Sequence, residues 1–113
     1  MKIDVKKIIK KPIAVSTDDA KKVKKEIMKA IDTKDEIEVS FENIDMLISH
    51  FLNVSIGELY AEYKNKWVEL DNIKYIGIND DDLKLLNKRV IPSFKNSSTD
   101  KEKFANIQKD ILK

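Results

Sequence analysis

The alternation of strand-like and helix-like hydrophobic patterns constrains the fold of this chain more than any other feature of its sequence. Residues 36–41 (Glu-Ile-Glu-Val-Ser-Phe) carry an apolar side chain at every second position, which is the period of a half-buried strand. Residues 17–31 instead repeat their apolar side chains every three or four positions, which is the period of an amphipathic helix. Because further segments of both kinds follow, we expect an α/β fold in which helices pack against a sheet.

The first third of the chain is expected to hold two strands and a helix. Ile3 begins an alternation of apolar and polar residues, so residues 3–15 are predicted to be extended. Pro12 interrupts this stretch, because proline cannot donate a hydrogen bond to a sheet, and residues 13–15 form a short second strand. Ser16 followed by acidic residues is a helix-start signal, and the predicted helix runs to about residue 31.

The remaining elements follow from the same two periods and from the helix-capping residues. They are a long helix over residues 45–64, a short strand or ordered connection over 67–70, a strand over 73–78, a helix from residue 79 that Pro92 ends, a linker over 95–98 and a last helix over about 99–112. Thr99 and Glu102 form the capping box of the last helix, which either completes the core or serves as an amphipathic arm for a second chain. We therefore expect one mixed β-sheet of about four strands with helices packed against it, plus a C-terminal helix.

Length and composition limit the classes of function. The 113 residues suffice for a single domain, 1–113, with its core at about 1–95. The chain has no cysteine, which excludes disulfides and thiolate chemistry and mildly favours a reducing compartment. No segment looks like a signal peptide or a membrane-spanning helix, so we expect a cytoplasmic protein with no membrane partner.

Nucleic-acid binding and cofactor chemistry find no support in the sequence. The 22 basic residues nearly balance the 20 acidic residues, and Arg89 is the only arginine, which argues against a nucleic-acid partner. His50 is the only histidine and has no acids at a metal-ligand spacing, so no metal site is expected. No glycine-rich phosphate loop is present, and no nucleophile–base–orienter set is visible. We therefore predict no cofactor, no catalytic residue and no enzymatic activity.

One face of the predicted helix over residues 45–64 combines small and polar side chains. It carries Met46, His50, Asn53 and Gly57 at spacings of three and four. Glycine within a helix is unfavourable by roughly 1 kcal/mol relative to alanine, so Gly57 requires a compensating role. Two explanations stay open: close packing of the helix on its own sheet, or a shallow groove that a partner approaches closely.

Several stretches of the sequence resemble a known family. They are residues 12–19 (Pro-Ile-Ala-Val-Ser-Thr-Asp-Asp), 39–44 (Val-Ser-Phe-Glu-Asn-Ile), 47–53 (Leu-Ile-Ser-His-Phe-Leu-Asn) and 56–60 (Ile-Gly-Glu-Leu-Tyr). Together they are similar to the bacterial STAS-like family of unknown function, over nearly the whole chain to about Ile91. That family is distantly similar to the STAS domains of anti-sigma-factor antagonists.

The resemblance implies a site at a helix start. In STAS domains a strand leads into a helix whose start carries a serine that a kinase with a histidine-kinase-like ATPase fold phosphorylates. Residues 48–51 (Ile-Ser-His-Phe) correspond to this place, with Ile48 where the family has an acid and His50 at the usual acceptor position. Ser49, one residue away, is the candidate phosphoacceptor, and a phosphate there would benefit from the backbone N–H groups of a helix N-terminus.

Two hypotheses of function follow. The first is a non-enzymatic regulatory module that binds another protein, such as a kinase-like ATPase, through Ser49 and the surface of His50, Asn53, Gly57 and Met46. The second is a structural or assembly subunit of a mobile-element or phage-defence system, acting as a homodimer or larger homo-oligomer through the last helix. An enzyme would need an active site assembled from Ser49, His50 and an acid, which we do not expect.

Overall fold

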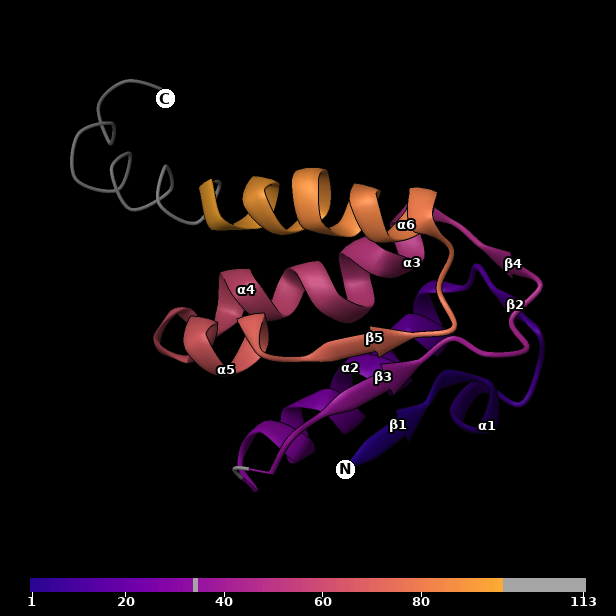
Figure 1. The fold of residues 1–113 in the computed structure, drawn as a ribbon, viewed down its shortest axis with the longest axis horizontal. Helices are drawn as coiled ribbons and strands as arrows, with labels where there is room; N and C mark the ends of the chain where they lie inside the picture. Colours follow the sequence, from indigo (N-terminus) through magenta and orange to yellow (C-terminus); the bar gives the residue numbers. More distant parts are fainter. Residues whose placement is uncertain (34, 97–113) are drawn as a thin grey trace.

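The computed structural model describes residues 1–33 and 35–96, and these form alternating short strands and helices (Figure 1). In chain order the elements are β1 (Lys2–Asp4), α1 (Val5–Ile9), β2 (Ile13–Ala14), α2 (Thr17–Ile31), β3 (Glu38–Ser40), β4 (Met46–Leu47), α3 (Ser49–Leu52), the π-helical turn η1 (Asn53–Gly57), α4 (Glu58–Glu62), the 3-10 turn η2 (Lys64–Lys66), α5 (Trp67–Asp71), β5 (Lys74–Ile76), α6 (Asp80–Leu85) and the π-helical turn η3 (Leu86–Val90). The predicted last helix over about 99–112 lies outside the described residues.

The strands form two small parallel sheets. The larger has the order β1-β3-β5, with Ile3, Val39 and Tyr75 side by side in register, and the smaller pairs β2 with β4. The predicted single mixed sheet of about four strands is therefore wrong, although the α/β class is correct. The physical reason is that β2 is only two residues long and Asn43, with a φ of 66°, turns the chain so that Met46 and Leu47 pair with β2 instead of extending the main sheet.

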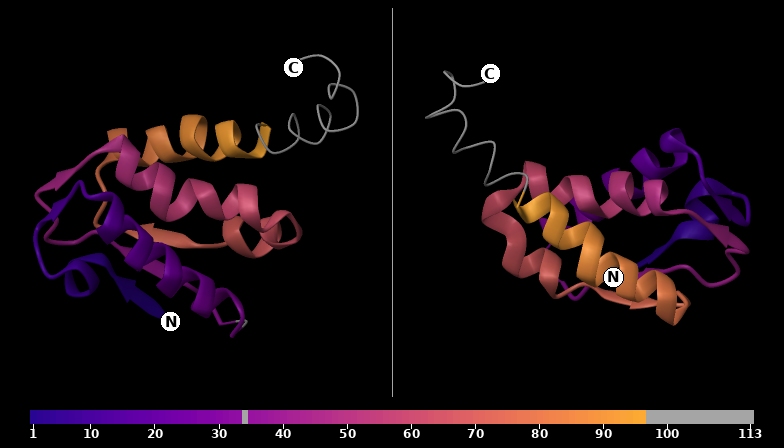
Figure 2. Two further views of the ribbon diagram at one scale, coloured as in Figure 1. Left: turned by 180° about the vertical axis from the view of Figure 1, so that it is seen from behind. Right: turned by 90° about the horizontal axis from the view of Figure 1, so that it is seen from above.

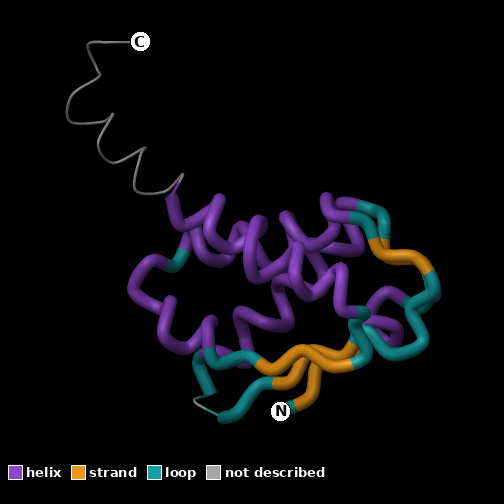
Figure 3. The backbone as a smooth tube through the Cα atoms, turned by 45° about the horizontal axis from the view of Figure 1, so that its top comes forward, coloured by secondary structure: helices purple, strands orange, loops and turns teal. Residues whose placement is uncertain are grey.

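Helices cover one face of the three-stranded sheet. Ile3 and Val39 are buried on this face, and α2 and α4 lie in front of the sheet when the molecule is seen from behind (Figure 2). Figure 3 shows one group of strands along one side of the molecule and most of the helices along the other. On the opposite face Lys2, Glu38 and Lys74 lie in register, and their charges suit a surface that faces water.

Capping residues read from the sequence predict the starts of α2 and α6 correctly. The hydroxyl of Ser16 accepts a hydrogen bond from the Asp19 backbone N–H at 3.3 Å, which caps α2 at its predicted start. The Asn79 side chain accepts from the Asp82 N–H at 2.8 Å and caps α6 in the same way. Lys24 of α2 donates to Glu58 and Glu62 of α4 at 3.0 and 2.6 Å, so an ion-pair network joins the two helices.

Two stretches predicted as extended are helical. Residues 5–9 form α1 because Asp4 caps this turn, accepting from the Lys7 N–H at 3.3 Å, and because Val5 and Ile9 are buried at a spacing of four. Trp67–Asp71 form α5 because the Trp67 indole donates to the Tyr60 carbonyl at 2.7 Å and Leu70, three residues later, is buried.

The boundaries of two predicted helices also differ from the structure. The helix predicted from residue 45 begins at Ser49, because β4 occupies the preceding positions. Pro92 does not end the last described helix, which continues to Asn96, so residues 95 and 96 are not part of a linker. The π-helical turn η3 ends two residues before Pro92 and is wider than an α-helical turn, which helps to accommodate the missing N–H group and the ring.

Candidate functional site

Two parallel strands bring two helix starts together. β2 leads through Ser16 into α2, and β4 leads through Ile48 into α3. Because Ala14 pairs with Leu47 and the Ile48 N–H donates to the Ala14 carbonyl at 3.3 Å, the two helices start side by side. A hydrogen bond of 2.9 Å between Thr17 Oγ1 and His50 Nε2 joins their first turns.

An ion pair fixes the segment before β2 against the same helix. Lys11 Nζ lies 2.8 Å from Oδ2 of Asp19, whose side chain is almost fully buried in the first turn of α2. An unpaired carboxylate at such a position would be strongly unfavourable, so Lys11 stabilises the buried charge. The ion pair supports the position of the segment that leads into β2, and pairing with β4 places Ile13 beside Met46.

An apolar patch surrounds the start of α3. Ile13 and Met46 are 42% and 54% exposed and are partners in the β2–β4 register, which places their side chains on one face. Ile48 follows Met46 by two positions and is 39% exposed. These residues, here called the apolar patch (Ile13, Met46 and Ile48), are three of the five exposed large hydrophobic residues in the described part of the chain. Such clustering is characteristic of an interaction surface, whereas single exposed apolar residues are ordinary.

Ser49 and His50 lie at the edge of the apolar patch. Both are exposed and belong to the first turn of α3. Ile48 is the N-cap of this helix and provides no side-chain hydrogen bond to the first N–H groups, in contrast to Ser16 at the start of α2. The Ser49 hydroxyl therefore stands beside backbone donors that no side-chain cap satisfies.

The other residues predicted for the site are placed differently. Asn53 is half-buried and lies one turn after Ser49, at the start of η1. Gly57 is buried, and a Cβ atom at this position would lie 2.5 Å from Phe94 ring atoms and 3.1 Å from Val90 Cγ1. Gly57 therefore permits close packing against the last described helix, not against the sheet, and it is not part of the exposed surface. Met46 was predicted to lie on a helix face, which is wrong, because it belongs to strand β4.

Sequence reasoning missed Ile13, Ile48 and Thr17. Ile13 and Thr17 join the site only because β2 pairs with β4, and this pairing connects segments more than thirty residues apart. Ile48 carried a local signal, because an isoleucine at a helix N-cap position is unfavourable for the helix.

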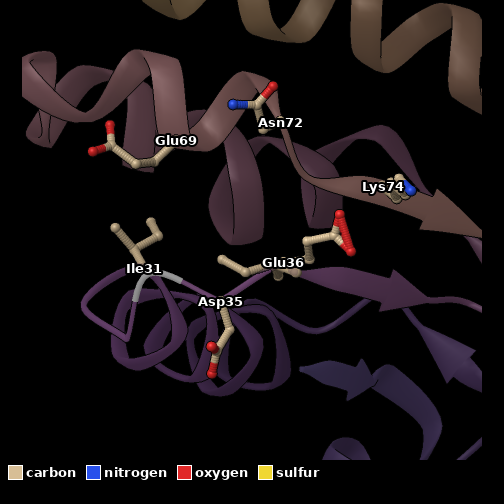
Figure 4. Close-up of a pocket in the computed structure, with 7 residues that line it drawn as sticks. Ile31, Asp35, Glu36, Glu69, Asn72 and Lys74 are labelled. Atoms are coloured by element: carbon tan, nitrogen blue, oxygen red, sulfur yellow. The ribbon is translucent and has the colours of Figure 1, made fainter.

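Two cavities lie near opposite ends of the strands. One of about 430 Å³ adjoins the apolar patch and is lined by Met46 and Leu47 of β4, by Gly77 and by Asn79 and Asp82 of the α6 start, among others. The other, of about 490 Å³, lies between α5 and the start of β3 (Figure 4). Asp35, Glu36 and Glu69 line it with Lys74, but the described residues hold no cluster of three or more potential metal ligands. None of the predicted site residues lies in this second cavity.

A second polar cluster lies between α4, α5 and β5. Tyr60 Oη donates to Asp71 Oδ1 at 2.8 Å, and Lys95 Nζ contacts Asp71 Oδ2 at 3.1 Å. Burial, reinforced by the hydrogen bond to Asp71, raises the pKa of Tyr60 well above its ordinary value. Burial also raises the pKa of Tyr75, whose hydroxyl has no hydrogen-bond partner among the described residues.

Comparison with known proteins identifies a family for this chain. None of the helices in the described part of the chain is long and apolar enough to cross a membrane. No curated protein and no solved structure matches the chain significantly. The model of the family described as "STAS-like domain of unknown function (DUF4325)" matches residues 19–83, from the first turn of α2 into α6, and so spans β4 and the start of α3. The chain belongs to this STAS-like family.

Proposed function

We propose that this chain is a non-enzymatic regulatory module that binds another protein through the start of α3. The single observation that supports this function best is the apolar patch of Ile13, Met46 and Ile48, exposed beside Ser49 and His50. A partner that covers these side chains removes apolar area from water, which contributes roughly 25 cal/mol for each Å² buried. The neighbouring cavity of about 430 Å³ offers room for a side chain of the partner.

Polar groups border the apolar patch in the proposed interface. Ser49 and His50 are exposed, and Asn53 follows one turn later. The hydrogen bond between His50 and Thr17 links the two helix starts, and in this proposal it helps to preorganise the docking surface. In this proposal His50 and Thr17 position the surface and carry out no catalytic step.

The partner that the STAS resemblance suggests is a kinase-like ATPase, with Ser49 as the residue that it modifies. A phosphate on Ser49 would add negative charge next to the apolar patch and would accept hydrogen bonds from the first N–H groups of α3. The added charge and its hydration would oppose burial of the patch. Phosphorylation would therefore release the partner, which is a simple switch.

The test compares an exposed apolar residue inside the patch with another exposed apolar residue outside it. Tagged wild-type chain, Met46→Arg and Val68→Arg are used to capture partners from a lysate of the source cells, and the dissociation constant is then measured with the purified partner. Val68 lies on α5 and is 74% exposed, so Val68→Arg is the matched control. We expect Met46→Arg to weaken binding at least about tenfold, as is usual for a central interface residue, and Val68→Arg to leave binding unchanged. Equal binding by both variants would show that the start of α3 is not the interface.

The regulatory part of the proposal needs a separate measurement. With the same partner, Ser49→Ala should bind like the wild type and Ser49→Glu should bind more weakly, because it introduces the negative charge without the modification. Intact-mass analysis of the chain purified from its source then shows whether Ser49 carries a phosphate. If Ser49→Glu binds as tightly as Ser49→Ala, the switch is wrong even where the docking surface is correct.

A further inference from the structure

The outer edge of β5 is unpaired in the described part of the structure. β5 is the last strand in the order β1-β3-β5. The Lys74 N–H donates to the Ile37 carbonyl at 2.9 Å, and the Phe41 N–H donates to the Ile76 carbonyl at 2.8 Å. The backbone groups of Lys74 and Ile76 therefore face β3. Because backbone groups of successive strand residues point to opposite edges, the N–H and C=O of Tyr75 point away from β3.

A cavity of about 480 Å³ runs along this outer edge. Leu83, Asn87 and Ile91 form one wall, and their spacing of four places them in one stripe of the helix that begins with α6. Tyr60 and Leu70 also line the cavity. In Figure 1, α6 lies on the side of β5 that faces away from β3, so the helix bounds the space into which the sheet can grow.

The hydroxyl of Tyr75 supplies a second, independent indication of a ligand. Tyr75 lines the same cavity, and its hydroxyl oxygen is buried with no hydrogen-bond partner among the described residues. The nearby Tyr60 hydroxyl already donates to Asp71. Buried hydroxyls normally have a hydrogen-bond partner, and a strand added at this edge can supply the acceptor.

We infer that the outer edge of β5 binds one extended peptide segment of a partner protein, added to the sheet as a further strand beside Tyr75. Main-chain hydrogen bonds to the Tyr75 N–H and C=O provide the affinity, as in other cases of strand addition. The residue of the peptide next to Tyr75 points toward the helix wall, so it should be apolar or should offer a hydrogen-bond acceptor to the Tyr75 hydroxyl. The helix that begins with α6 lines the cavity beside this edge, so the occupant we propose is a single peptide strand and not a second folded copy of the chain. This site is separate from the start of α3 and goes beyond the proposed function.

The first test asks whether the edge is open in the full chain. Amide hydrogen exchange, followed residue by residue by NMR, should show fast exchange of the Tyr75 N–H and protection of the Lys74 N–H, which is bonded to β3. Equal protection of the two amides in the free chain would overturn the inference, because the edge would then be covered already, for example by residues 97–113 of the same chain.

The second test asks directly which peptides bind to this edge. A library of random 12-residue peptides displayed on phage is selected against the full chain, and enriched peptides are synthesised for affinity measurement. We expect apolar residues at alternate positions, and binding at least about tenfold weaker to Asn87→Trp, which fills the cavity from an exposed position. Lys88→Trp, at the neighbouring exposed position that does not line the cavity, is the matched control and should bind normally.

The outcomes separate this site from the start of α3. Met46→Arg should bind the selected peptides like the wild type, and Asn87→Trp should retain the partner that docks at the apolar patch. Failure to enrich any peptide, or equal affinity of Asn87→Trp and Lys88→Trp with unchanged circular dichroism, would refute strand addition at β5. Concentration-dependent dimerisation that Asn87→Trp abolishes would equally refute it, because the occupant would then be a second copy.

Discussion

Replacement of Gly57 by alanine sets two well-defined effects against each other. In a helix, alanine is favoured over glycine by roughly 0.5–1 kcal/mol, so the intrinsic effect is stabilising. In this structure, however, the new Cβ would lie 2.5 Å from Phe94 Cδ2 and Cε2 and 3.1 Å from Val90 Cγ1. Overpacking of this kind destabilises by roughly 1–3 kcal/mol, so we expect a net loss of about 0.5–2 kcal/mol in the free energy of unfolding.

The assay is equilibrium urea unfolding of wild type, Gly57→Ala and Asn53→Ala. Asn53→Ala is the control, because it lies in the same π-helical turn but is half-buried and is expected to show only the small gain in helix propensity. We expect Gly57→Ala to unfold at lower urea with an unchanged m-value. The double variant Gly57→Ala with Phe94→Leu should recover part of the loss, because the smaller side chain makes room for the new methyl group.

A stabilised Gly57→Ala would refute this reasoning. It would mean that helix propensity outweighs packing and that the last described helix does not press on Gly57. The alternative explanation, that Gly57 opens a shallow groove for a partner, would then be favoured. Additive effects in the double variant would likewise argue against direct contact between positions 57 and 94.

Three further predictions concern stability. Tyr75→Phe should be neutral or stabilising by up to about 1 kcal/mol in thermal unfolding, because it removes a hydroxyl that has no partner in the described structure, and a loss above that size would reveal a hidden partner. The folded-state pKa values of Tyr60 and Tyr75 lie above the ordinary value of 10.0, so their contribution to stability is complete below pH 10 and is lost as the pH rises further. Phenolate absorbance should therefore develop for these two residues only with unfolding, and early ionisation would contradict their burial. Lys24→Met should destabilise by about 1 kcal/mol, because Glu58 and Glu62 lose their shared cation, and an unchanged urea midpoint would show that the network contributes nothing.

Local chemistry explains which parts of the fold could be predicted from the sequence. α2 was predicted closely, because Ser16 caps it and its apolar residues keep one period throughout. The strand around Val39 followed from its strict alternation. The STAS-like family assignment also followed from local motifs, which the family match over residues 19–83 confirms.

The errors occurred where distant parts of the chain decide the local structure. Met46 and Leu47 fit the period of a helix, but the turn at Asn43 and pairing with β2 make them a strand. Pro92 is a helix breaker in isolation and is tolerated because η3 widens the turn before it. Such effects depend on tertiary geometry, which overrides intrinsic propensity.

The candidate site, like the fold, was predicted only in part from the sequence. Ser49, His50 and Met46 were predicted, and the structure brings them together at the start of α3. Ile13 could not be predicted as a neighbour of Met46, because their contact depends on the β2–β4 register. Gly57 was grouped with the site from helix periodicity alone, yet its packing against Phe94 places it elsewhere.

Site-specific crosslinking tests the central claim, docking at the start of α3, most directly. The chain has no cysteine, so Met46→Cys and Val68→Cys each provide a unique thiol for a photoactivatable maleimide. Both positions are exposed, and illumination in source-cell lysate covalently links whatever protein lies against each of them. We predict one discrete crosslinked partner from position 46, absent from position 68 and diminished when Ile48→Arg is added. A partner that is linked from position 68 and not from position 46 would contradict the account.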